Sequence, residues 1–122
     1  MMMKSFLCCD DVMRKAVLAG AMVLAAYPVV AQTVNEDAAE ALAKAGGCFK
    51  CHSVEKAKKA PSYKRIALKY KGKADAEGAL IKHLSGTQTV KVEDGGDEAH
   101  EPPPAKDAAD LKNLVQWILS RG

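Results

Sequence analysis

Aromatic side chains are scarce in this sequence: among its 122 residues there are one tryptophan, three tyrosines and two phenylalanines. Large rings supply much of the volume that a folded chain buries, and a short chain buries a smaller share of its surface than a long one. The length allows one domain. We therefore expect a single small domain whose interior contains a group other than side chains.

Runs of basic residues interleaved with aromatics are also missing, and the net charge is only +3. A nucleic-acid-binding surface typically shows such runs, so we expect no nucleic-acid partner. No apolar stretch has the length of roughly 20 residues that a membrane-spanning helix needs. The sequence therefore predicts no membrane span in the mature chain.

The N-terminal segment has the pattern of an export signal. Two basic residues, Arg14 and Lys15, precede the apolar stretch 16–26, and small residues before position 32 suit a cleavage site. This order of features is typical of a secretory signal peptide. We predict a signal peptide over residues 1–31 and a periplasmic mature protein, with a retained N-terminal anchor as the alternative.

The first twelve residues do not fit a signal peptide, because Asp10 and Asp11 stand where basic residues are expected. We expect translation to start at Met13. Cleavage after Ala31 leaves only Cys48 and Cys51 of the cysteines. It leaves no methionine, because all five methionines precede residue 32.

The mature chain, residues 32–122, has the periodicity and the capping residues of a helical protein. Most of residues 87–104 read as a long loop, and only 89–92 have any strand character. The expected helices cover 32–47, 62–71, 75–84 and the segment from 107 to the C-terminus. The predicted fold class is all-α, with one domain.

The sequence Cys48-Phe49-Lys50-Cys51-His52 is a C-x-x-C-H motif, which is typical of c-type haem attachment. Two cysteines three positions apart on a tight turn can form thioether bonds to the two vinyl groups of one haem. The next residue, His52, is then held beneath the iron as the proximal ligand. The motif predicts one covalent haem c with its iron.

Other chemistries also use a C-x-x-C pair, and they stay open at this point. A structural zinc site needs four ligands, which His83 and His100 could complete. A thioredoxin-like redox pair needs a βαβ context, which the sequence does not show. A disulfide would be stable in an oxidising compartment.

The mature chain resembles the small bacterial class I cytochromes c over nearly all of residues 35–122. The resemblance includes the first helix leading into the C-x-x-C-H motif, then Pro61-Ser62-Tyr63-Lys64, Leu80-x-x-x-Leu84-x-Gly86, a proline-rich loop and the helix ending Leu114-Val115-x-Trp117-Ile118-Leu119. It implies that the N- and C-terminal helices pack together around one covalent haem. It also implies that the backbone carbonyl of Pro61 bonds to the proximal histidine.

The sequence departs from that family at two positions. Ala60 precedes Pro61, where the family usually has glycine. The family also places a methionine, the sixth iron ligand, directly before a Pro-Pro pair, whereas Glu101 stands there in this chain, preceded by His100. The sixth ligand must therefore be something other than methionine.

Three answers compete for the sixth position. We favour His100, which gives a low-spin bis-histidine haem with a reduction potential below that of methionine-ligated relatives. The alternatives are an open site and His83, which we expect to lie on the surface of its helix. Acidic neighbours of His100 are expected to favour its protonated form, which would oppose ligation at low pH.

These features favour a soluble single-electron carrier that is not an enzyme. The alternatives are a haem protein with an open or displaceable sixth site for a gas, and a dedicated cytochrome subunit of a periplasmic dehydrogenase or oxidase. Basic residues dominate the segment 50–73 and acidic residues dominate 93–101. This asymmetry predicts redox partner proteins with an acidic docking surface.

Overall fold

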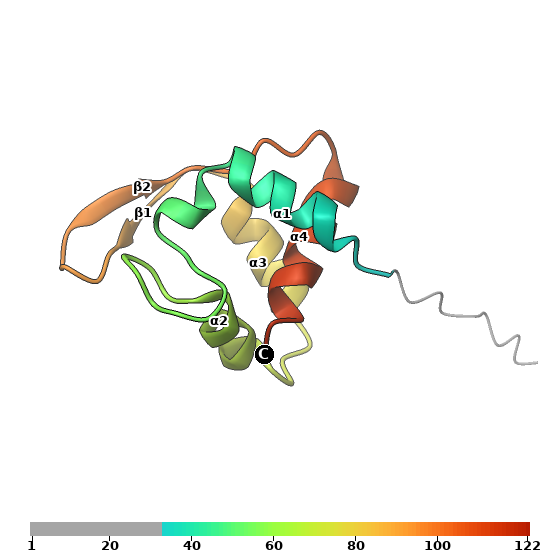
Figure 1. Cartoon of the computed structure of the whole chain (residues 1–122), viewed down its shortest axis with the longest axis horizontal. Helices are drawn as coiled ribbons and strands as arrows, with labels where there is room; N and C mark the ends of the chain where they lie inside the picture. The colour runs from blue at the N-terminus through green and yellow to red at the C-terminus, as the bar shows by residue number, and fades with distance from the viewer. Residues whose placement is uncertain (1–32) are drawn as a thin grey trace, which may run out of the picture. The chain divides into compact units, whose positions relative to one another are not determined.

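The computed structural model describes residues 33–122. The predicted signal peptide, residues 1–31, lies outside the described residues. The elements of the described chain are α1 (Glu36–Ala45), η1 (Cys48–Lys50), α2 (Tyr63–Tyr70), α3 (Ala76–Leu84), β1 (Gln88–Lys91), β2 (Asp97–His100) and α4 (Ala108–Leu119) (Figure 1). Within this part of the chain, no helix combines the length and the hydropathy that crossing a bilayer requires.

Side-chain caps set the start of three helices. The side chains of Asn35, Ser62 and Asp107 each accept a hydrogen bond from a backbone amide in the first turn of α1, α2 and α4. These caps satisfy amides that have no partner within the helix. The observed helices are shorter than the expected ranges by a few residues at their ends, which is where helices fray.

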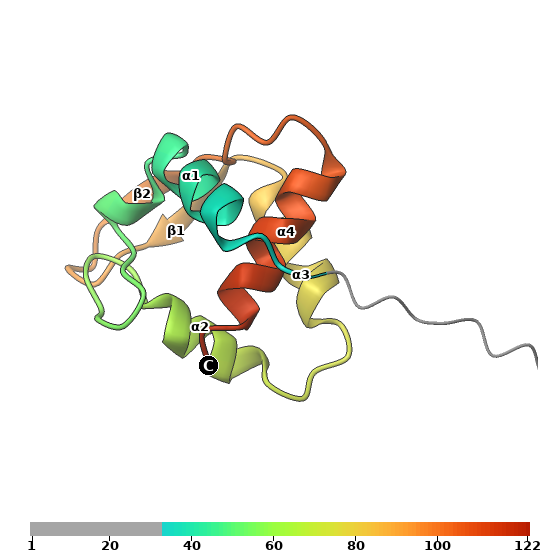
Figure 2. The ribbon, with the colours of Figure 1, turned by 45° about the vertical axis from the view of Figure 1, so that its right-hand side comes forward.

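The core lies where α1 crosses α4, as the cytochrome resemblance implies (Figure 2). Ala39 and Ala43 of α1 have no exposed surface, and they face Leu114, Val115 and Trp117 of α4, which are 0–1% exposed. Alanine on one helix lets the larger residues of the other approach closely. Helices α2 and α3 also pack against α4.

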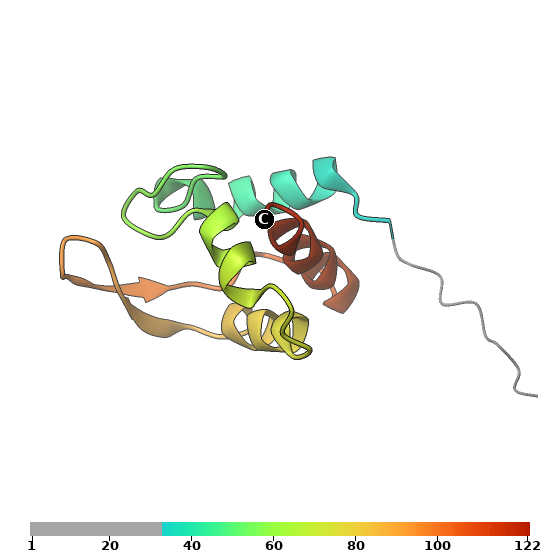
Figure 3. The same ribbon diagram turned by 90° about the horizontal axis from the view of Figure 1, so that it is seen from below.

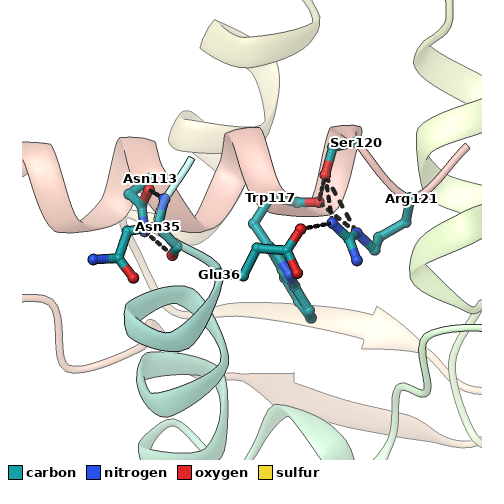
Figure 4. Close-up of polar contacts among 6 residues, drawn as sticks. All are labelled: Asn35, Glu36, Asn113, Trp117, Ser120 and Arg121. Atoms are coloured by element: carbon teal, nitrogen blue, oxygen red, sulfur yellow. Dashed lines mark hydrogen bonds and ion pairs between the residues drawn. The ribbon is translucent and has the colours of Figure 1, made fainter. Parts of the chain in front are cut away.

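Polar contacts hold the start of α1 on α4 (Figure 4). The side-chain amide of Asn113 accepts from the backbone N–H of Asn35 at 2.8 Å and donates to its carbonyl at 2.8 Å. Arg121 donates to Glu36 at 2.9 Å and lies 5.2 Å from the ring centre of Trp117. These contacts hold the start of α1 at two places, one within α4 and one just after its end.

Residues 87–104 correct the prediction of a long loop, because two short strands form within them. The predicted helical fold class is confirmed, with this small two-stranded sheet added to the helices. Strands β1 and β2 form an antiparallel hairpin in which Gln88 pairs with His100 and Lys91 pairs with Asp97. Gly95, with φ +84°, makes the turn. The hairpin extends away from the helices (Figure 1).

The sequence of β2, Asp-Glu-Ala-His, has low strand propensity and no apolar alternation, so tertiary contacts decide this strand. The backbone amide of Glu93, beside the turn, donates to the carbonyl of Lys59 at 2.9 Å. The ammonium of Lys59 contacts Glu98 at 3.0 Å. The hairpin is therefore attached to the loop that follows η1.

Candidate functional site

A cavity of about 930 Å³ separates the turn around η1 from the β1–β2 hairpin. Figure 3 shows the segment after η1 and the hairpin on opposite sides of this region. The chain contains three histidines, and His52, His83 and His100 all line the cavity. Cavities that hold cofactors have volumes of about 300–1,000 Å³, so this one can take a ligand the size of a porphyrin.

Two glycines form the turn that carries the cysteines. Gly47 has φ +67°, a conformation that other residues rarely adopt. A Cβ atom on Gly46 would lie 3.2 Å from Cα of Pro103, so only glycine lets the segment after β2 approach the turn this closely. The helix expected over residues 32–47 ends directly before these glycines, at Ala45.

The turn is tight enough to present both thiols and His52 to the cavity. The backbone amides of Cys51 and His52 donate to the carbonyl of Cys48 at 3.2 and 2.8 Å. No disulfide joins Cys48 and Cys51, so both sulfur atoms are available for thioether bonds. Burial raises the pKa of the Cys48 thiol, an effect partly offset by a hydrogen bond with Tyr63.

The ring of His52 is held from two directions. Its Nδ1 lies 2.7 Å from the backbone oxygen of Pro61. A carbonyl oxygen can only accept, so Nδ1 carries the proton and Nε2 keeps a free lone pair. Burial lowers the pKa of His52, which favours this neutral form.

The other support of His52 is aromatic. The imidazole stacks on Tyr63, with ring centres 5.1 Å apart and planes 19° apart. Tyr63 in turn meets Trp117 edge to face at 5.4 Å. Tyr63 was expected in a helix and in the motif Pro61-Ser62-Tyr63-Lys64, and nothing in the sequence pattern showed that it connects His52 to the core.

His100 lies at the end of β2, across the cavity from His52, with ring centres 6.3 Å apart. Its Nδ1 is buried and has no hydrogen-bond partner among residues 33–122. Burial, then repulsion from His83 and His52, lowers the pKa of His100. Glu101 does favour the protonated form, as expected, but its effect is smaller than that of burial and of the two other histidines, so the net shift of the pKa is downward.

His83 is half-buried in the cavity wall, so the expectation of an exposed surface histidine is wrong. Its ring centre lies 4.6 Å from that of His100. The side-chain amide of Gln88 donates to the backbone oxygen of His83 and lies 2.9 Å from its Nδ1. Helical spacing from Leu80 and Leu84 suggested another direction, because the hairpin whose Gln88 and His100 contact the His83 ring was not predicted.

Helix α2 adds two cations to the cavity wall, Arg65 and Lys69, with Tyr70 beside them. Residues four apart lie on the same face of a helix, so the spacing of Arg65 and Lys69 was a signal that the sequence analysis did not use. The carboxylates of a porphyrin are anionic, and these side chains could neutralise them.

The residues that line the cavity fit a haem. Metal ions bind imidazole nitrogen at about 2 Å, so two imidazoles on opposite sides of one ion have ring centres about 6 Å apart, which the 6.3 Å between His52 and His100 matches. A zinc site needs more ligands together, and residues 33–122 contain no cluster of three or more His, Cys, Asp or Glu side chains that could hold a metal.

Comparison with known families decides the identity of the fold. The family described as Cytochrome c matches residues 36–122. The chain belongs to the cytochrome c family. It therefore carries one covalently bound haem c with its iron, and Cys48 and Cys51 occupy the C-x-x-C-H position.

Curated relatives of this cytochrome are small proteins of the same family. Cytochrome c-551 of Allochromatium vinosum is 43% identical over 83 residues, which cover 64% of this chain and 80% of the relative. Cytochrome c-551 of Pseudomonas aeruginosa is 31% identical over 99 residues, covering 80% of this chain and 90% of the relative.

Solved structures show the same fold. The class 1 cytochrome MtoD from Sideroxydans lithotrophicus is 49% identical, with a TM-score of 0.69 over 73% of this chain and 98% of MtoD. Cytochrome c552 of Nitrosomonas europaea is 34% identical, with a TM-score of 0.54 over 68% of this chain and 99% of that protein. The mainly helical class I fold is thus shared across almost the whole length of these proteins.

Proposed function

We propose that this cytochrome is a periplasmic single-electron carrier with a bis-histidine haem. Thioether bonds from Cys48 and Cys51 attach the haem, His52 is the proximal ligand and His100 is the sixth ligand. The haem iron supplies the chemistry by alternating between its ferrous and ferric states. The observation that carries this proposal is that His52 and His100 lie across one cavity, with their ring centres 6.3 Å apart.

The proximal wall prepares His52 for this role. The Pro61 carbonyl holds the proton on Nδ1, which leaves the Nε2 lone pair for the iron. Such a hydrogen bond also makes the ligating nitrogen more basic. The stack on Tyr63 fixes the plane of the ring.

The distal wall supplies a nitrogen ligand where the family usually has sulfur. No methionine exists among residues 32–122. Imidazole stabilises ferric iron more than a thioether does, so the potential should lie below that of methionine-ligated cytochromes. The lowered pKa of His100 keeps its ring neutral, which ligation requires.

A visible and near-infrared spectrum of the purified haem protein tests the ligand set. We expect low-spin spectra in both redox states. Carbon monoxide should bind much more slowly than it binds to a haem with an open sixth position. The haem should stay attached to the protein in acidified organic solvent. A redox titration should give a potential below that of methionine-ligated relatives. A high-spin spectrum or a potential in the usual methionine range would contradict the proposal.

Cell fractionation tests export. We expect the coloured protein in the periplasmic fraction, with a mass and an N-terminal sequence that begin at Gln32. A protein that keeps residues 13–31 would indicate a retained anchor instead.

Partner docking is proposed to use the basic surface next to the cavity. Lys56, Lys71 and Lys73 have no carboxylate partner among the described residues, and Lys69 lies at the cavity wall. Exposed charges of one sign steer an oppositely charged partner. The Lys59–Glu98 contact shows that the acidic and basic segments meet, so the charge asymmetry is smaller than the sequence suggests.

Electron-transfer rates at several salt concentrations test this docking. We expect the rate with an acidic redox partner to fall as ionic strength rises. Replacing Lys71 and Lys73 by glutamine should weaken the salt dependence, whereas replacing Lys112, which pairs with Glu77 of α3 at 3.5 Å, should leave it unchanged. A rate that does not depend on salt would remove electrostatic steering from the proposal.

One observation favours a second candidate, a gas-binding haem protein. Metal-ligating histidines almost always donate their second ring N–H to an acceptor, and Nδ1 of His100 has none. This would make the bond from His100 to the iron easier to displace than the proximal bond. Tight, rapid binding of carbon monoxide or nitric oxide to the ferrous protein would favour this candidate over an electron carrier.

A further inference from the structure

We propose that His83 is a reserve distal ligand, which binds the haem iron when His100 leaves it. The inference rests on the proposed bis-histidine site. It starts from the distal wall of the cavity, where two imidazoles lie with ring centres 4.6 Å apart. A single sixth coordination position cannot use both rings at once.

The two histidines are carried by elements of different stability. His83 lies on α3, whose residues Leu80 and Leu84 belong to the core and pack towards α4. His100 ends β2, which contains no buried residue and contacts the loop after η1 through the exposed pair Lys59–Glu98. Exposed elements with few buried contacts open first, so local opening of the hairpin removes His100 and leaves His83 in place.

Gln88 explains why His83 does not compete in the closed state. The NH₂ group of Gln88 donates to the backbone oxygen of His83, so the nitrogen of this amide, and not its oxygen, faces Nδ1 of the ring. Nδ1 must then accept, and the proton of neutral His83 lies on Nε2. In this tautomer Nε2 has no lone pair for the iron.

The same residue couples the two ligands. Gln88 is the hairpin partner of His100 in the β1–β2 register. A displacement of the hairpin that withdraws His100 therefore also moves Gln88 away from His83. The proton of His83 can then move from Nε2 to Nδ1, and Nε2 forms a bond to the iron as the His100 bond breaks, with no net change in protons or electrons.

Three variants of the haem protein test this exchange: His100→Ala, the double variant His100→Ala/His83→Ala, and the matched control His100→Ala/Lys82→Ala. Lys82 is an exposed neighbour on the same helix. Absorption and electron paramagnetic resonance spectra report the spin state and the ligand. Added imidazole that restores a low-spin haem in the double variant shows that its pocket is folded.

We expect the haem of His100→Ala to stay low-spin. The g values of its electron paramagnetic resonance spectrum should shift, because the His83 ring binds the iron in a different orientation from His100. The Lys82 control should behave in the same way, and the double variant should become high-spin and bind carbon monoxide much faster. Replacing Gln88 by leucine in the His100→Ala background should increase the low-spin fraction.

Two results would overturn the inference. A high-spin His100→Ala protein that matches the double variant would show that His83 does not reach the iron, and the proposed bis-histidine function would stand on the wild-type spectrum. A His100→Ala spectrum identical to the wild type would show that His83 is already the resting ligand, which would also remove His100 from the proposed function.

Discussion

The two walls of the cavity are built in different ways. The proximal ring, His52, is next to the covalent attachment, donates to Pro61 at 2.7 Å, and stacks on Tyr63, which contacts Trp117 in the core. The distal ring, His100, ends a two-stranded hairpin, and its Nδ1 has no partner. The proximal ring is thus supported by contacts that continue into the core, and the ring of His100 is not.

This difference indicates that the two sides of the haem site have different functions. A rigid proximal side keeps the haem attached and orients one ligand. A distal side on a separate hairpin can change its ligand, and therefore the reduction potential, without disturbing the helical core. The proposed replacement of methionine by histidine in this chain occurs on the distal side.

Removing each imidazole in turn should give the largest contrast. We expect His52→Ala to yield almost no coloured protein, because the haem loses the ligand that lies within the attachment motif. His100→Ala should yield covalent haem protein in amounts near the wild type. The pyridine haemochrome spectrum, measured against total protein, checks both. Equal yields from the two variants would contradict the contrast.

Truncations in the core and in the hairpin should differ in stability. Leu114→Ala, at a residue 1% exposed, should cost about 2–5 kcal/mol. Val92→Ala, at the buried residue beside the hairpin, should cost about 1–2 kcal/mol at roughly 0.8 kcal/mol per buried methylene-sized group.

Denaturant unfolding measures both values, with the exposed Leu68→Ala as a control that should change stability little. If Val92→Ala lowers the free energy of unfolding as much as Leu114→Ala does, the hairpin is part of the core.

Acid should release the distal ligand before the proximal one. Neutral imidazole binds the iron, so falling pH favours dissociation. Burial and the other histidines lower the pKa of His100, so the low-spin spectrum should persist below the ordinary histidine pKa of about 6.5. His52, held by Pro61, should stay bound at still lower pH. A pH titration of the ferric spectrum, ending with haem still covalently attached, checks the order.

The smallest effect is expected from the charge pair that attaches the hairpin. Lys59 and Glu98 are both exposed, and such pairs contribute little in salt. Glu98→Gln should slightly raise the rate of carbon monoxide binding at low ionic strength by loosening the hairpin, with no difference from the wild type at high salt. An effect that persists at high salt would point to a role for Glu98 beyond the ion pair.

Much of this protein was predictable from local sequence. The capping residues Asn35 and Asp107 and the glycine stop at Gly46 located the first and last helices, because caps act through neighbouring backbone groups. The hairpin was not predictable, because β2 has no strand propensity and is held by Lys59 and by its pairing with β1. The error at His83 followed from that omission.

By itself, the sequence determined that Cys48, Cys51 and His52 share one tight turn, because their spacing along the chain sets their spacing in space. Only the tertiary structure decided which groups lie across from that turn. His83 and His100 are seventeen residues apart, and they meet because β2 returns antiparallel to β1, which places His100 opposite Gln88, close to the end of α3. A contact between distant residues depends on how elements pack, and no local pattern encodes it.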